Sequence, residues 1–162
     1  MRRYAILFSI GLVLGGSGGF ALGIFVYPYW FLADVVSRDE VTSESQRKLI
    51  ATGSFAHANP SDPIHWGKGD AKVYEDLVHL ASNFEVGPGP KYHVYLVPEA
   101  TVTPNTAVEK TMFVDLGRLR SFKGSQNYPI PPGVDVKNYP HLVIWCEQFG
   151  VLISPAKLQH NL

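Results

Sequence analysis

The sequence lacks a second cysteine: Cys146 stands alone among 162 residues. An intramolecular disulfide is therefore impossible, and the fold must depend on a hydrophobic core. An excess of positive charge is also missing, since fourteen Lys and Arg balance fourteen Asp and Glu. Binding to nucleic acid needs basic residues to neutralise phosphates, so we expect no nucleic-acid partner.

Local signatures of common enzyme classes are absent as well. The chain has no GxxxxGK[ST] loop, GxGxxG turn, HExxH helix, GxSxG elbow or CxxC pair. No nucleophile has a base at a usable spacing, which leaves a hydrolase unsupported. The sequence therefore does not indicate a classical enzyme.

Charge is missing from one long stretch, residues 4–32, which follows Arg2 and Arg3. At about 1.5 Å per residue, a helix of this length crosses a hydrocarbon core of roughly 30 Å. We therefore expect residues 1–33 to form a transmembrane signal-anchor that contacts membrane lipid through residues 4–32. The arginine pair predicts a cytoplasmic N-terminus, a single pass through the plasma membrane, and a periplasmic or extracellular C-terminal domain.

The far end of this stretch has features of a membrane interface. Tyr27, Tyr29 and Trp30 carry rings with a polar tip, and Pro28 can end the helix. The alternative is a cleaved signal peptide with a site near residues 17–23, but its apolar region is usually only about 7 to 15 residues long. The longer run favours an uncleaved anchor.

Glycine recurs every fourth residue within the stretch, and the positions are Gly11, Gly15, Gly19 and Gly23. This spacing places four residues that have no side chain on one helix face, where a second helix could approach closely. The pattern predicts a homodimer or a membrane partner. The alternative is the ordinary abundance of glycine in membrane helices.

Residues 34–50 form a polar segment between the apolar stretch and the rest of the chain. Its charges alternate in sign, at Arg38, Asp39, Glu40, Glu44, Arg47 and Lys48. Large apolar residues are few, so the segment is predicted to be a solvated stalk.

Residues 51–160 have the size of one domain and lack a sustained helical period. Short β-branched and aromatic runs alternate with turn residues, which predicts an all-β fold, an antiparallel β-sandwich or barrel of about eight strands. The expected strands are 52–58, 69–74, 77–84, 92–97, 112–116, 127–130, 142–147 and 151–154.

Cys146 lies in the most apolar of these runs, residues 141–147. Alternation along a strand places Cys146 on the face of Leu142 and Ile144, away from His141. The thiol is either a buried core residue or a redox or ligand group. In the second case a co-ligand must come from another strand, and the candidates are His57, His65, His79 and His93.

One loop offers a further candidate site. His57 and His65 bracket a proline-rich loop with Asp62 inside it, which could clamp a metal ion or could simply be a rigid surface loop. Trp66, beside glycine in the same segment, is a candidate for ligand binding.

Several separated motifs occur in an order that resembles the electron-transfer DM-thirteen domain family, known from Skeletor-type proteins, where it accompanies DOMON domains. The resemblance covers about residues 51–158. Its motifs are residues 53–55, 65–71, 83–84, 87–88, 94–96, 116–119, 123–131, 139–149 and 156–158.

This resemblance implies an all-β extracytoplasmic domain in which Cys146 acts in redox chemistry, either as a bare thiol or by holding haem or a metal. The chain has no DOMON partner, so an electron donor or acceptor would be another molecule. The sequence therefore predicts a membrane-anchored redox or electron-transfer module. The alternative is a non-catalytic binding module of the cell envelope in which Cys146 is structural.

Overall fold

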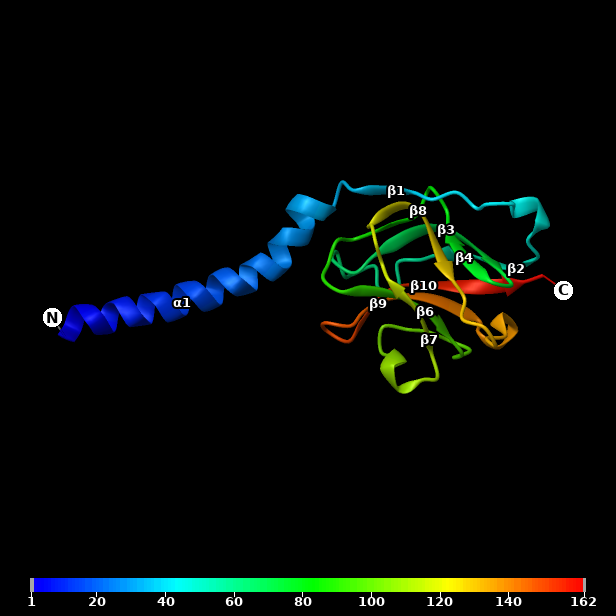
Figure 1. Ribbon diagram of the computed structural model, residues 1–162. Coiled ribbons are helices and arrows are strands. Elements are labelled where there is room, and N and C mark those ends of the chain that lie inside the picture. The colour runs from blue at the N-terminus through cyan, green and yellow to red at the C-terminus, as the bar shows by residue number, and fades with distance from the viewer. Residues whose placement is uncertain (1, 162) are drawn as a thin grey trace.

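The computed structural model describes residues 2–161 and shows one long helix followed by a β-rich domain (Figure 1). Helix α1 spans Arg2–Tyr27 and continues into a π-helical turn, η1, at Pro28–Leu32. Three short 3-10 turns follow later, η2 (Glu44–Gln46), η3 (Val108–Lys110) and η4 (Val136–Asn138). The ten strands are β1 (Val36–Arg38), β2 (Leu49–Phe55), β3 (Gly67–Tyr74), β4 (Leu77–Leu80), β5 (Glu85–Val86), β6 (Tyr92–Val97), β7 (Val114–Arg118), β8 (Lys123–Pro129), β9 (His141–Cys146) and β10 (Val151–His160).

The strands form one hydrogen-bonded sheet in the order β1-β8-β4-β3-β2-β10-β9-β6-β7, and β5 pairs with β3 and β8. All pairs are antiparallel except β1 with β8, which is parallel. Residues from both halves of this sheet meet in one large buried cluster, so the sheet curves around its core. A second, smaller cluster contains Tyr95, Val143 and Trp145, which puts β6 and β9 between two apolar layers.

The expected all-β domain after one apolar helix is confirmed, and each of the eight expected strands overlaps an observed one. The structure adds β1 and β5, which are too short to leave an alternating pattern. The finer choice between sandwich and barrel stays a prediction, because the strands belong to a single continuous sheet.

Helix α1 has the length and the apolar composition of a membrane span over Arg2–Ile24, and none of that span is buried against the domain. Such a helix could be a membrane anchor or a signal sequence. Its glycine face, Gly11, Gly15, Gly19 and Gly23, is open, since an added Cβ would meet no atom within 4 Å. The predicted helix association at this face stays a prediction.

The polar segment 34–50, expected as a solvated stalk, lies along the domain. Its strand β1 pairs with β8. Asp39 accepts a hydrogen bond from the backbone N–H of Asn127 at 2.9 Å and forms an ion pair with Arg120. Glu44 accepts from Lys72 Nζ at 2.7 Å and from the Tyr74 hydroxyl at 2.6 Å. The charges that suggested a stalk therefore bind the segment to the sheet.

Candidate functional site

Strand β9 carries the lone cysteine through the middle of the domain, between β10 and β6. Every residue of this strand is buried. Leu142, Ile144 and Cys146 belong to the large core cluster, whereas Val143 and Trp145 belong to the smaller one. The two faces predicted from alternation are thus confirmed.

Cys146 is a free thiol with only 1% of its surface exposed. Its Sγ donates a hydrogen bond to the carbonyl oxygen of Pro90 at 3.2 Å. Burial raises the pKa of the Cys146 thiol above its ordinary value, and the negative charge of Glu147 adds to this effect, although backbone N–H groups of Phe149 and Gln148 oppose it. The thiol therefore stays protonated at neutral pH.

The same sulfur lies in the wall of a small pocket. The pocket has a volume of about 310 Å³, near the lower end of the range for ligand sites. Its lining is mostly apolar and consists of Ile64, His65, Pro88, Gly89, Pro90, Tyr92, Cys146, Phe149 and Val151. The structure thus brings Cys146 and His65, two residues singled out in the sequence, to one pocket.

His65 is oriented by the loop that precedes it. Its Nδ1 lies 2.6 Å from Oδ2 of Asp62, whose Oδ1 accepts the backbone N–H groups of Ile64 and His65. These hydrogen bonds, led by that of the His65 ring, lower the pKa of Asp62 to about 2. His57 contacts the backbone oxygen of Asp62 at 2.8 Å. The loop is therefore fixed by hydrogen bonds centred on Asp62.

The remaining candidates have other partners. The Nδ1 atom of His79 contacts Asn127 at 2.6 Å. Trp66 is half-buried, its carbonyl accepts the N–H of Gly87, and Lys68 Nζ lies 5.9 Å from its ring centroid. Its ring is therefore only partly available to a ligand.

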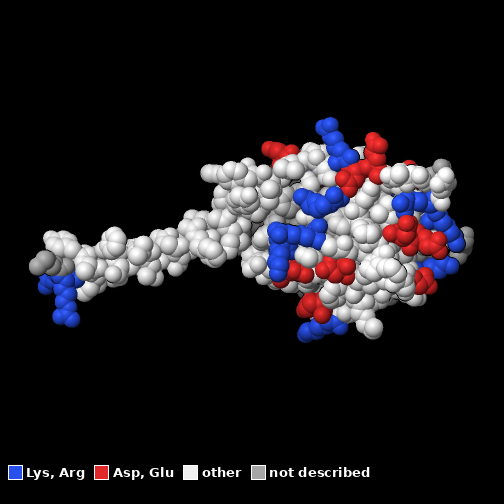
Figure 2. All heavy atoms as spheres, in the orientation of Figure 1, with Lys and Arg blue, Asp and Glu red and all other residues white. Residues whose placement is uncertain are grey.

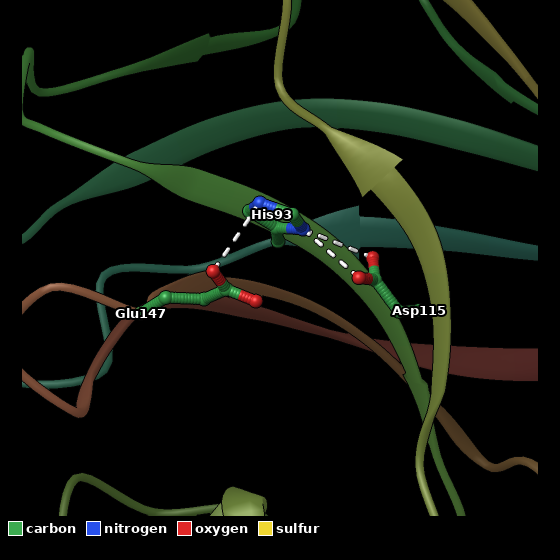
Figure 3. Close-up of side chains that lie close together, drawn as sticks. All are labelled: His93, Asp115 and Glu147. Carbon is green, nitrogen blue, oxygen red and sulfur yellow. Dashed lines mark hydrogen bonds and ion pairs between the residues drawn. The ribbon is translucent and has the colours of Figure 1, made fainter.

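A cluster that the sequence did not reveal as a unit lies around His93 (Figure 3). Its Nδ1 is 3.0 Å from Asp115 Oδ2, and its Nε2 is 3.5 Å from Glu147 Oε2. Glu147 also accepts from the buried Tyr95 hydroxyl at 2.8 Å, which lowers the pKa of its carboxyl group, and pairs with Lys91 at 3.3 Å. The sequence did not indicate Asp115 as a site residue, because its strand β7 lies beside β6 only through the pairing of the sheet.

Among residues 2–161, the group formed by His93, Asp115 and Glu147 is the one with three donors close enough to hold a metal ion, all within 4.8 Å of one another. Cys146 belongs to no such group. Because no such donor group surrounds Cys146 in the described part of the chain, and its pocket has a volume of only about 310 Å³, the site does not fit a preformed metal centre or a large macrocycle. The geometry instead offers a shielded thiol that a small apolar molecule could contact.

Comparison with known proteins gives one result that bears on this site. The family model described as Electron transfer DM13 matches residues 60–158, more than half of the chain. No curated protein matches the sequence, and no solved structure matches it. The matched range contains β3 to β9, most of β10, His65, and the pocket with Cys146. Because the match covers this much of the chain, the protein belongs to the Electron transfer DM13 family.

Proposed function

We propose that this chain is an extracytoplasmic electron-transfer module, held at a membrane by α1, in which Cys146 is the redox group. Membership of the family supports a redox role. The observation that carries the proposal is the position of the only cysteine in the wall of an apolar pocket that it shares with His65.

The pocket selects what reaches the sulfur. A protonated thiol reacts slowly with bulk electrophiles and disulfides, because the thiolate is the nucleophile. The apolar lining and the volume of about 310 Å³ admit small neutral molecules and exclude large or charged ones. A hydroperoxide also reacts with the thiolate, so oxidation of Cys146 proceeds slowly through the small thiolate fraction, and the pocket restricts it to small molecules.

Oxidation of this thiol has a defined chemical course. The protein holds no second cysteine with which Cys146 could form an intramolecular disulfide. A hydroperoxide would transfer one oxygen atom to Sγ as its O–O bond breaks, which gives a sulfenic acid and releases water or an alcohol. Two external thiols would then return the electron pair, regenerate the thiol, and leave as one disulfide and water.

The full chain in lipid nanodiscs, treated with dilute hydrogen peroxide, tests this proposal. We expect mass spectrometry to find one added oxygen on Cys146 in the folded protein and to find the free thiol again after addition of a small dithiol. Oxidation that occurs only in the unfolded chain would refute the redox role. The variant Cys146→Ala gives the background from methionine oxidation.

The alternative is a non-catalytic binding module in which Cys146 is structural. Its burial and its hydrogen bond to Pro90 favour this second candidate. In that case Cys146→Ala would cost stability alone, whereas substitutions in the loop 57–66 would abolish binding to an envelope partner.

Anchoring and topology belong to the same proposal. The apolar surface of α1 and the arginine pair at its N-terminal end support an uncleaved, single-pass anchor with the domain outside the plasma membrane. The open glycine face supports a helix partner, including a second copy of this chain. Alkaline extraction tests the anchoring, and protease added to intact cells tests the orientation of the domain.

A further inference from the structure

A cavity of about 650 Å³ lies between the end of the apolar helix and the domain. Its helix side is apolar and includes Phe20, Gly23, Ile24 and Tyr27, whereas its domain side includes Lys91, Arg118 and Arg120. Figure 2 shows Lys and Arg side chains, with acidic ones beside them, on the part of the domain nearest the helix, while the helix has charged residues only at its N-terminal end. The cavity thus has an apolar helix side and a mixed domain side, on which its three cations lie.

The depth of this cavity matches the boundary between hydrocarbon and headgroups. The candidate span Arg2–Ile24 has 23 residues, a length of about 34 Å at 1.5 Å per residue, and a hydrocarbon core is roughly 30 Å thick. The exposed rings of Tyr27 and Trp30 follow directly, where aromatic residues favour the interface. The domain side of the cavity therefore lies at the level of the lipid phosphates.

The domain is held at this depth by the chain itself. Only residues 33–35 separate η1 from β1, and the hydroxyl of Ser121 donates a hydrogen bond to the carbonyl of Val35. Pairing of β1 with β8 then fixes the next residues. The domain consequently cannot move far from the helix end.

The charges lining the cavity leave one cation unpaired. Lys91 pairs with Glu147, and Arg120 pairs with Asp39. Arg118 is exposed, and its guanidinium group has no hydrogen bond or ion pair with any residue in the range 2–161. The cavity thus has a net positive charge beside an apolar wall, which suits a single phosphodiester attached to an acyl chain.

We propose that this cavity binds one anionic phospholipid from the outer leaflet, with its phosphate at Arg118 and an acyl chain along Phe20, Gly23 and Ile24. A zwitterionic lipid fits less well, because its ammonium group would approach the same cation. The inference rests on the anchoring in the proposed function. It also deepens that function, because the cavity shares Gly89, Pro90 and Tyr92 with the pocket of Cys146. The bound lipid therefore borders the thiol pocket.

The test uses the full chain in nanodiscs with equal amounts of phosphatidylglycerol and phosphatidylcholine, followed by native mass spectrometry of the lipid retained. We expect the wild-type protein to retain phosphatidylglycerol preferentially. A basic residue near a charged membrane surface contributes about 1 kcal/mol, so Arg118→Gln should reduce the preference about fivefold. Arg118→Lys should restore most of it, because the charge is the same.

Lys137→Gln is the matched control, since Lys137 is exposed in η4 and lines no part of this cavity. Equal retention of the two lipids by the wild-type protein, or an unchanged preference in Arg118→Gln, would overturn the inference. Loss of the lipid in the presence of excess inorganic phosphate would identify a site for soluble anions and would overturn it too. A chain that fails to insert into the bilayer would instead refute the anchoring.

Discussion

Gly124 in β8 lies so close to Ser37 in β1 that an added Cβ would overlap the Ser37 carbonyl oxygen. Gly124 also has a φ of +86°, a conformation that side chains rarely adopt. The close approach occurs where β1 pairs in parallel with β8, through which the chain leaving the apolar helix joins the sheet. This contact keeps the domain next to the end of α1.

Gly124→Ala should release β1 from the sheet. The strained φ alone costs about 1 to 3 kcal/mol, and the clash with Ser37 adds to that cost. We expect faster amide hydrogen exchange over residues 36–40 and a lower free energy of unfolding. Gly133→Ala is the matched control, because Gly133 has a φ of +87° but open space around it. Equal effects on residues 36–40 in both variants would contradict the role of the close approach.

The thiol of Cys146 should alkylate slowly in the folded protein. Because burial raises its pKa, the thiolate fraction at neutral pH is lower than in the unfolded chain, and the rate should rise only at higher pH. The rate of labelling by N-ethylmaleimide between pH 7 and about 10 measures this shift of the Cys146 pKa, with the urea-unfolded chain as the reference.

Access to the thiol should depend on the rim of the pocket. Ile64 lines the pocket and is 53% exposed, so Ile64→Ala should widen the entrance at little cost in stability and accelerate labelling several-fold. Met112→Ala removes an 86% exposed apolar side chain outside the pocket and should leave the rate unchanged. If both variants label like the wild-type protein, the sulfur is reached by another route or by local unfolding.

The stalk shows where sequence reasoning reached its limit. Asp39, Glu44 and Arg47 have the composition of a solvated linker, yet each has a partner far along the chain, in Arg120, Lys72 and Asp76 respectively. Composition reports which residues carry charge but not which residues face them across a sheet. The pairing of β1 with β8 spans more than 80 positions and leaves no local pattern.

The site was partly predictable for the opposite reason. Strand alternation is local, so the two faces of β9 and the placement of Cys146 with Leu142 and Ile144 could be predicted from the sequence. The approach of His65 to the same pocket depends on the loop centred on Asp62 and on β9 ending near Pro90. The His93 cluster likewise depends on the register between β6 and β7.

Tyr95→Phe should destabilise the domain. The Tyr95 hydroxyl is buried and donates to Glu147, and burial together with that carboxylate raises the pKa of Tyr95. A hydrogen bond to a charged group contributes about 1.5 to 3 kcal/mol, and partial exposure of Glu147 places the expected loss near the lower limit. Urea unfolding measures it, and Tyr139→Phe is the control, since the Tyr139 hydroxyl has no partner among residues 2–161.

The loss in Tyr95→Phe should also depend on pH. The Tyr95 hydrogen bond lowers the pKa of Glu147, so its stabilising contribution is present above the ordinary carboxyl value and is lost as the pH falls through the lowered one. The difference between wild type and variant should therefore shrink in acid. A difference that grows below pH 4 would contradict this assignment.

Asp62→Asn should weaken the loop that orients His65 at the pocket. The pKa of Asp62 is lowered to about 2, mainly by the hydrogen bond with the His65 ring, so the folded state favours its ionised form. The resulting stability is complete above the ordinary value of 3.8 and is lost as the pH falls from about 4 towards 2. At neutral pH we expect a loss of about 1 kcal/mol, because the amide keeps the backbone hydrogen bonds to Oδ1 but loses the charge facing His65. Urea unfolding at pH 7 and at pH 2 should show the full difference at the higher pH and only a small part of it at pH 2. A difference of equal size at both values would mean that Asp62 acts through packing, and not through its charge.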